Sequence, residues 1–222
     1  MFLSRIFTLY PEYFPGYLNK GLFGKAMNEK IWNLETVNIR DYTFDKHKTV
    51  DDTPYGGGSG MIIKADVLAK SLDENIKEKE KIIYLSPKGK LFDHKYAKEL
   101  STEKTLNLIC GHFEGIDERI IQNRNIEEVS IGDFVLSGGE VATFVVLDAI
   151  LRFIPGVLGN ENSTQDESFE NGLLEYPQYT KPQNWEDKSV PDVLLSGDHA
   201  KIKDWRLSQS EAITRVRRPD LW

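Results

Sequence analysis

The sequence contains very little cysteine and no long hydrophobic run. Cys110 is the single cysteine among 222 residues, so an internal disulfide is excluded and a reducing compartment is expected. No stretch approaches the roughly 18 apolar residues of a membrane-spanning helix. Arg5, Glu12 and Pro15 interrupt the N-terminal stretch before a secretory core could form. We therefore expect a cytoplasmic protein with no membrane partner.

Positive charge is also in deficit. The formal net charge is −7, which argues mildly against a nucleic-acid partner and gives no support to DNA binding. Phosphate contacts come from local patches, however, and from Lys201 onward six basic residues face three acidic ones. The six are Lys201, Lys203, Arg206, Arg215, Arg217 and Arg218. By themselves they fit a solvated helix face or a nucleic-acid contact.

The glycine-rich segment 51–60 (DDTPYGGGSG) lacks the features of known phosphate-binding loops. It has neither the Lys-Ser/Thr pair of a P-loop nor dinucleotide-binding spacing. A flexible connector is the favoured interpretation, while Asp51, Asp52 and Tyr55 leave a substrate-facing role open. The four histidines, at positions 47, 94, 112 and 199, show no metal-ligand spacing, and we predict no protein metal site.

Short apolar segments alternate with helical ones along most of the chain. Strands are expected at Arg5–Leu9, Thr36–Ile39, Met61–Ile63, Lys81–Leu85, Leu106–Cys110 and Ser130–Leu136. Helices are expected at Lys64–Lys77, His94–Leu100, Glu114–Asn123 and His199–Arg217. Strands separated by helices predict an α/β fold with a mostly parallel sheet covered on both faces.

The segment Val141–Ile154 is apolar nearly all round, which predicts a helix buried on most sides. Asp148 and Arg152 stand four apart on one of its faces and could pair there. The polar stretch that follows lacks periodicity and indicates a linker. We thus expect a first domain at 1–158, a linker at 159–172 and a small helical domain at 173–222.

Three loops with glycine follow predicted strands, at Ser86–Gly89, Gly111–Gly115 and Ser137–Glu140. At the carboxyl edge of an open sheet such loops could enclose a flat ligand such as adenosine, although glycine after a strand is often only turn chemistry. Cys110 and His112 could form a thiolate–imidazole pair, but a buried apolar cysteine is the favoured interpretation. Glu114 lies inside its glycine turn, a position that suits contact with a ligand.

Read in order, these segments resemble the bacterial tRNA (guanine-37-N1)-methyltransferase family of the knotted SPOUT class. CGHFEGIDER (Cys110–Arg119) and SIGDFVLSGGE (Ser130–Glu140) are the most specific matches. The others are IFTLYPEYF (Ile6–Phe14), DDTPYGGGSGM (Asp51–Met61), YLSPKG (Tyr84–Gly89), PGVLGN (Pro155–Asn160), DESF (Asp166–Phe169), GLLEYPQYTKP (Gly172–Pro182), VLLSGDH (Val193–His199) and WRLSQS (Trp205–Ser210).

The resemblance implies a first domain with a trefoil knot that binds S-adenosylmethionine, and a homodimer whose active site lies between subunits. It implies methyl transfer to N1 of the guanine beside the anticodon of transfer RNA. The anticodon stem-loop is the expected partner, and the small domain at 173–222 is expected to bind it. The implied cofactor-binding residues are Tyr84, Leu85, Ser86, Pro87, Gly89, Gly111, Gly115, Ile131, Gly132, Asp133, Phe134, Val135, Leu136, Gly138, Gly139 and Glu140.

The resemblance also implies the catalytic groups. The family's general base is an aspartate, and the matching position is Glu167, with Asp166 beside it as an alternative. Arg152 matches the arginine that stabilises negative charge on guanine O6, and Glu114 matches an acid facing the cofactor and base. His112 departs from the family's usual arginine. Some relatives need Mg²⁺, for which no site is evident here.

Two other functions remain open at this stage. One is an RNA-binding module that has lost its cofactor and is catalytically inert. The other is a methyltransferase of the same class that acts on a different RNA. The glycine loops together with Glu114, Arg152 and Glu167 favour the active enzyme.

Overall fold

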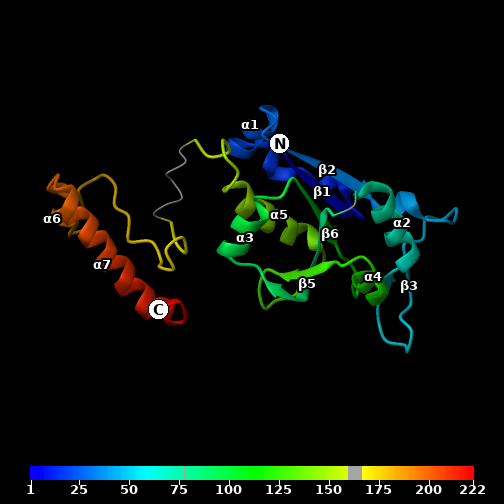
Figure 1. Ribbon diagram of the computed structural model, residues 1–222. Coiled ribbons are helices and arrows are strands. Elements are labelled where there is room, and N and C mark those ends of the chain that lie inside the picture. The colour runs from blue at the N-terminus through cyan, green and yellow to red at the C-terminus, as the bar shows by residue number, and fades with distance from the viewer. Residues whose placement is uncertain (78, 160–166) are drawn as a thin grey trace. The chain divides into compact units, whose positions relative to one another are not determined.

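The computed structural model describes residues 1–77, 79–159 and 167–222 (Figure 1). The chain divides into two compact units, Met1–Gly159 and Asn160–Trp222. Each unit has its own internal contacts, so the two are described separately.

The first unit contains a five-stranded parallel sheet. Its strands are β1 (Phe2–Thr8), β2 (Trp32–Asn38), β5 (Lys81–Leu91), β6 (Thr105–Cys110) and β7 (Glu127–Ser130). Their order is β2-β1-β6-β5-β7, and every neighbouring pair is parallel. The expected α/β fold with a mostly parallel sheet is therefore confirmed.

Helices cover both faces of this sheet. The cluster on one face joins the sheet to α1 (Gly21–Asn28), α3 (His94–Leu100) and α5 (Gly139–Leu151). The cluster on the other face joins it to α2 (Ala65–Asn75) and α4 (Glu118–Asn123), which Figure 1 shows near each other. Along β6 the side chains alternate between the two clusters, as expected for a strand buried on both sides.

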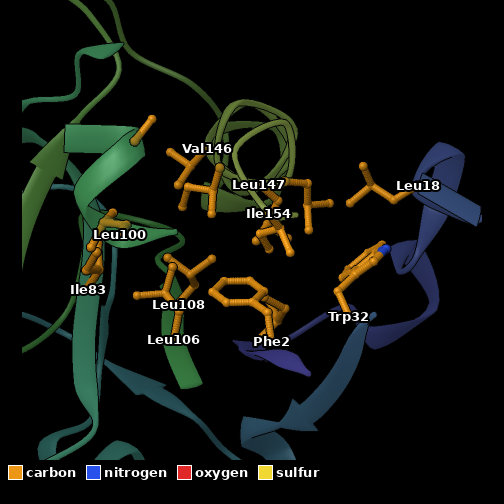
Figure 2. Close-up of a cluster of buried hydrophobic side chains, with 14 of the residues drawn as sticks. Phe2, Leu18, Trp32, Ile83, Leu100, Leu106, Leu108, Val146, Leu147 and Ile154 are labelled. Atoms are coloured by element: carbon orange, nitrogen blue, oxygen red, sulfur yellow. The ribbon is translucent and has the colours of Figure 1, made fainter. Parts of the chain in front are cut away.

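The larger cluster lies between the sheet and α5. Figure 2 shows Phe2, Leu108 and Leu147 pointing toward one another, with Trp32 beside them. Trp32 is fully buried and donates a hydrogen bond from its indole nitrogen to the carbonyl of Phe23 at 2.9 Å. A fully buried leucine such as Leu108 or Leu147 contributes about 1.5–3 kcal/mol to the free energy of unfolding, relative to an exposed leucine. This packing anchors α5, whose N-terminus borders the site described below.

The expected buried helix at Val141–Ile154 is α5, but it has one exposed stripe. Val146, Leu147 and Ile150 are fully buried, whereas Val141 and Val145 are exposed by 59% and 46%. The two exposed valines stand four residues apart, on one side of the helix. Burial on most sides was therefore correct, and an apolar strip is left on the surface.

Several of the sequence-based boundaries are wrong. The strand expected at Thr36–Ile39 begins at Trp32, and the strand expected at Lys81–Leu85 continues to Leu91. The strand expected at Ser130–Leu136 ends at Ser130, because β7 runs over Glu127–Ser130 and the chain then bends away. Glu127 can lie in the strand because the ammonium of Lys81 pairs with it at 2.7 Å. The helix expected from Glu114 begins only at Glu118, where the Asp117 carboxylate caps it by accepting from the Arg119 amide at 2.9 Å.

The glycine-rich segment 51–60 joins two short antiparallel strands, β3 (Asp51–Asp52) and β4 (Ile62–Ile63). Single 3₁₀ turns occur at η1 (Pro11–Tyr13), η2 (Gly16–Asn19) and η3 (Ile39–Tyr42). Tyr55 is fully exposed at the tip of the β3–β4 connection, which agrees with the connector interpretation for that part of the loop.

The second unit is built around one long helix. Its elements are β8 (Asn184–Trp185), β9 (Lys188–Ser189), α6 (Asp192–Leu195), α7 (His199–Arg217) and η5 (Pro219–Leu221). The Asp198 carboxylate caps α7 by accepting from the Lys201 amide at 3.2 Å. Buried Thr214 ties this helix to the preceding segment by accepting from the Leu174 amide at 2.8 Å. Among the residues described, no helix is long and apolar enough to cross a membrane.

Candidate active site

A cavity of about 290 Å³ opens where β5, β6 and β7 end. Its walls come from the irregular second half of β5, from the loops that follow β6 and β7, and from the start of α5. This is the edge of a parallel sheet at which ligands commonly bind.

Most of the residues for which cofactor contact was implied lie in this cavity. They are Tyr84, Leu85, Ser86, Pro87, Gly111, Gly115, Ile131, Gly132, Phe134, Val135, Leu136, Gly138 and Gly139. Glu114 lies there too, together with residues for which no contact with the cofactor was implied. Those additional residues include Lys88, His112, Phe113, Ile116, Glu118, Ile121, Glu128, Ser130, Ser137 and Ala142.

Three of the implied residues lie outside the cavity wall: Gly89, Asp133 and Glu140. Gly89 packs against the backbone of β7, because a Cβ there would lie 2.2 Å from the amide nitrogen of Val129. Asp133 is exposed, and Glu140 is buried behind the wall. Gly89 and Glu140 thus shape the site by holding together the segments behind its wall.

Two glycines make room for the ring of Tyr84. A Cβ on Gly111 would lie 2.7 Å from this ring, and one on Gly115 would lie 3.0 Å from its hydroxyl. Burial raises the pKa of the Tyr84 hydroxyl, and the nearby Glu128 carboxylate adds to the shift. The hydroxyl therefore stays protonated at neutral pH and gives the wall a neutral polar group.

The start of α5 is fastened to the end of β6. The Gly139 amide donates to the Gly111 carbonyl at 3.0 Å, and a Cβ on Gly139 would lie 2.6 Å from the Cα of Cys110. Gly138 and His112 form an isolated antiparallel bridge beside this contact. Only glycine permits so close a backbone approach, and this contact fixes the distance between the two loops.

Glu140 is the buried centre of a small polar network. Its carboxylate accepts from the hydroxyl of Thr8 at 2.6 Å and lies 2.8 Å from the Nε2 of His112. It also lies in the first turn of α5, where the helix dipole favours a negative charge. The ring of Tyr10 packs edge-on against His112, with centroids 4.9 Å apart. The network joins β1, the loop after β6 and α5, and sequence reasoning did not find it.

Cys110 is a buried structural residue. It is fully buried, and its sulfur lies 3.2 Å from the hydroxyl of Thr143. Burial raises the pKa of its thiol, and the charge of Glu140 raises it further, so no thiolate forms at neutral pH. The imidazole of His112 pairs with Glu140. The thiolate–imidazole alternative is therefore wrong.

Glu114 is placed by the glycine-rich connection. Its amide donates to the Met61 carbonyl at 3.0 Å, and its side chain covers Gly60, where a Cβ would lie 2.5 Å from the carboxylate. Gly60 also has a φ of +89°, which disfavours any other residue. One glycine of segment 51–60 therefore supports a site residue, a role that the spacing of the segment did not reveal.

The end of β5 pairs with the end of β7 after an irregular loop within β5 that begins at Ser86. Pairing between β5 and β7 shifts between Leu85 and Lys90, and Leu91 then pairs with Ser130. The Phe92 amide also donates to the Ser130 carbonyl at 2.8 Å. The segment that begins at Ile131 therefore leaves the sheet beside Leu91 and Phe92 before it reaches α5.

Comparison with known proteins identifies the family of this chain. The profile of the family described as tRNA (Guanine-1)-methyltransferase TrmD matches residues 2–222. The chain belongs to the TrmD family. A protein named tRNA (guanine-N(1)-)-methyltransferase from Pelagibacter ubique (strain HTCC1062) is 75% identical over 222 residues, which cover 100% of this chain and 97% of that protein.

More distant relatives in the TrmD family carry the same name. The protein from Bartonella tribocorum is 55% identical over 221 residues, covering 100% of this chain and 95% of its own. The protein from Brucella canis is 52% identical over 221 residues, covering 100% of this chain and 90% of its own. Similarity therefore extends across both units.

The implied catalytic residues are divided between the two units of this TrmD family member. Glu114 lies in the cavity of the first unit, and Arg152 caps the C-terminus of α5, where the helix dipole favours a cation. Glu167 belongs to the second unit and is partly buried, and its carbonyl accepts from the Glu170 amide at 3.4 Å. Asp166 lies outside the described residues. Within the described residues no group of three or more His, Cys, Asp or Glu could hold a metal ion.

Proposed function

We propose that this protein transfers a methyl group from S-adenosylmethionine to N1 of the guanine at position 37 of transfer RNA, beside the anticodon. The observation that carries the proposal is the match to the tRNA (guanine-1)-methyltransferase family over residues 2–222, together with relatives of that name. The cavity at the ends of β5, β6 and β7 supports it, because it gathers the loops that the resemblance assigns to the cofactor.

The cavity has the composition expected for an adenosine-containing cofactor. Backbone groups of the three loops can bond the polar edges of a purine, while Leu85, Ile131 and Leu136 supply apolar surface for its faces. Glu114 and Glu128 in the wall favour the positive charge of a sulfonium. When bound, S-adenosylmethionine would supply an electrophilic methyl group, and the protein has to align and activate the nucleophile.

The loop geometry also supports the trefoil knot implied by the resemblance. The chain leaves β7 beside Leu91 and Phe92, then lines the same cavity as the irregular loop of β5 that begins at Ser86, and joins the end of β6 through Gly139 and Gly111. A path that enters beside one strand and re-emerges beside another is what threading through that loop requires. In this proposal Gly89 is needed because the loop touches the β7 backbone.

Guanine N1 carries a proton at neutral pH, so the reaction needs a base and a group that stabilises charge on O6. Glu167 takes the proton in our proposal, with Asp166 as the alternative base. Arg152 faces O6, where its guanidinium stabilises the negative charge that develops as the proton leaves. Glu114 orients the cofactor or the guanine from the wall of the cavity.

We further propose that the protein acts as a homodimer, so that the second unit of one chain completes the site of the other. The exposed strip of α5 supports this assembly. Val141 and Val145 lie on it, and exposed Tyr17 donates from its hydroxyl to Asp148 of the same helix at 2.9 Å. Aromatic and aliphatic residues of this kind are typical of the core of a subunit interface.

Methyl transfer is tested with labelled S-adenosylmethionine and unmodified transfer RNA transcripts that carry guanine or another base at position 37. We expect label only in the guanine transcripts, as N1-methylguanosine in the digested product. Absence of label from every guanine transcript would refute the function. Calorimetry with S-adenosylmethionine identifies the alternative of an inert module, which would bind no cofactor.

The base is assigned by comparing Glu167→Gln with Asp166→Asn in single-turnover reactions. We expect Glu167→Gln to slow methyl transfer about a hundredfold or more while cofactor affinity is retained, since a general base contributes roughly 10² to 10⁴. Arg152→Ala should have a comparable effect. A normal rate in Glu167→Gln, with loss in Asp166→Asn, would move the role to Asp166. Parallel reactions with a chelator test the Mg²⁺ requirement of some relatives.

A further inference from the structure

The second unit contains a cavity of its own, of about 430 Å³. It lies between the segment 176–183 and the helices α6 and α7, entirely within this unit. Its lining consists of Tyr176, Pro177, Gln178, Tyr179, Thr180, Lys181, Gln183, Val190, Leu194, Leu195, Ile202, Trp205 and Arg206. It shares no lining residue with the cavity of the first unit.

Aromatic rings form two sides of the cavity. Tyr179 and Trp205 have ring centroids 6.3 Å apart, with planes inclined by 55°, and Tyr179 is 48% exposed. The guanidinium of Arg206 lies over the ring of Tyr176 at 4.7 Å. The exposed ring of Tyr179 is therefore open to a planar ligand beside the partly buried ring of Trp205, whereas Tyr176 is covered by a cation.

The charge in the cavity has one sign. Lys181 and Arg206 are the two charged residues of the lining, and no carboxylate is among the lining residues. The Nε of Arg206 is buried and has no hydrogen-bond acceptor in the described part of the chain. This atom is out of reach of a ligand, so the cationic donors that the cavity offers are the ammonium of exposed Lys181 and the outer guanidinium nitrogens of partly exposed Arg206.

We propose that this cavity binds one nucleotide of the substrate RNA. The base stacks on the exposed ring of Tyr179, with the inclined ring of Trp205 against its edge, and its phosphate accepts from Lys181 and Arg206. Stacking on aromatic rings beside a cationic groove is the general chemistry by which proteins hold unpaired nucleotides. A peptide segment would use the apolar residues but would leave the two cations without an anionic partner. The proposal rests on the proposed function, since it takes the RNA to be transfer RNA.

The test measures binding of a labelled, unmodified transfer RNA transcript to the full chain by fluorescence anisotropy. Tyr179→Ala removes the exposed ring, Tyr179→Phe keeps it, and Lys181→Ala removes a cation. Matched controls come from the neighbouring hairpin, where Trp185→Ala removes an exposed aromatic and Lys188→Ala an exposed lysine. None of these residues is buried, so all five variants are expected to fold.

We expect Tyr179→Ala to raise the Kd about tenfold, which is within the range known for one stacked base. Lys181→Ala should also raise it, while Tyr179→Phe and both controls stay within twofold of wild type. A 4-thiouridine transcript should form photo-crosslinks that map to Tyr179 or Trp205. If Tyr179→Ala and Lys181→Ala bind as wild type does, the cavity is not an RNA site.

Further measurements distinguish failure of this inference from failure of the proposed function. Loss of the dimer in Tyr179→Ala, measured by sedimentation, would make the cavity a protein contact and overturn the proposal. Cofactor affinity, measured by calorimetry, should be unchanged in every variant because the cofactor cavity belongs to the other unit. If wild type methylates transfer RNA but Tyr179→Ala and Lys181→Ala bind it normally, the inference about this cavity is wrong and the proposed function stands. If wild type methylates no transfer RNA, the proposed function fails.

Discussion

The two cavities of this protein are built in opposite ways. The cavity of the first unit is enclosed by loops whose backbones touch, and Tyr84, Ser86 and Glu140 in or behind its wall are all less than 10% exposed. The cavity of the second unit is surrounded by side chains that are exposed or only partly buried. The inner wall of the first is therefore fixed, although exposed Phe134 and Val135 form part of its rim, and the second is free to adjust.

This difference matches the two ligands that the proposed reaction brings together. A small cofactor is held in one conformation most effectively by preorganised backbone groups, because no ordering is needed at the moment of binding. A long RNA meets the surface over many weak contacts, most of them electrostatic. Substitutions in the first cavity should therefore affect folding and cofactor binding together, while those in the second should affect RNA affinity alone.

The largest effect is expected from Gly139→Ala. The new Cβ would lie 2.6 Å from the Cα of Cys110, so β6 and α5 would have to separate. We expect a loss of about 3 kcal/mol in the free energy of unfolding and no measurable binding of S-adenosylmethionine. Urea unfolding and calorimetry measure the two quantities.

Gly159→Ala is the matched control, since nothing lies within 4 Å of a Cβ at that position. Thr180→Ala makes a change of similar size in the second cavity and should leave the unfolding midpoint nearly unchanged. Equal losses in Gly139→Ala and Thr180→Ala would contradict the contrast between a fixed and an adjustable cavity.

His112→Ala should have the next largest effect. It leaves the buried carboxylate of Glu140 with the Thr8 hydroxyl as its remaining side-chain partner among the described residues. We expect a cost of about 2 kcal/mol, the usual penalty of a buried polar group that loses a partner. His112→Gln retains a donor and should recover part of this stability. Full stability of His112→Ala in urea unfolding would show that the network does not hold the loops together.

A change in salt dependence is expected from Lys203→Ala on α7. Removing one phosphate contact should lower the slope of log K against log salt by about one, with no change in the cofactor's Kd. The measurement is anisotropy with labelled transfer RNA across a salt series, with Lys25→Ala in the first unit as the control. An unchanged slope would remove Lys203 from the RNA-binding surface.

The smallest effect concerns the Lys81–Glu127 pair at the edge of the sheet. Partial burial raises the pKa of Glu127, but the hydrogen bond and charge of Lys81 outweigh it, so the pKa lies below its usual value. Stability from such a group is present above the carboxyl's ordinary pKa and is lost as the pH falls through the lower folded value.

Thermal unfolding of Lys81→Met and wild type, compared between pH 7 and pH 3, tests this pair. We expect the variant to lose less stability on acidification, by about 0.5 kcal/mol. The exposed Lys25–Glu29 pair is the control, and Lys25→Met should show no such difference. A larger acid sensitivity in Lys81→Met than in wild type would show that Lys81 does not lower the pKa of Glu127.

Elements with strong local signals could be predicted from the sequence. The helices at His94–Leu100 and His199–Arg217 occur with the expected bounds, because Asp93 and Asp198 cap them with local hydrogen bonds. The strand expected at Ser130–Leu136 failed for the opposite reason. β7 contains two glutamates and is held by pairing with β5, a contact that no local pattern records.

The candidate site was predictable in its loops but not in its supports. Glycines after strands indicated where the cavity walls would be, and the structure brings those walls together. The network around Glu140 joins residues 28 and 132 positions apart in the sequence, and the contact between Gly60 and Glu114 is similarly distant. Such contacts exist only once the chain has folded.

The sequence by itself determined the alternation of strands and helices, the parallel α/β class and the family to which the chain belongs. Those properties follow from local periodicity, capping and motif spacing, which are written in neighbouring residues. The tertiary structure alone decided that Gly111 and Gly115 shelter Tyr84, that Cys110 is inert, and that His112 pairs with a buried carboxylate. These depend on close packing between segments far apart in the chain, where one methyl group or one hydrogen bond changes the geometry.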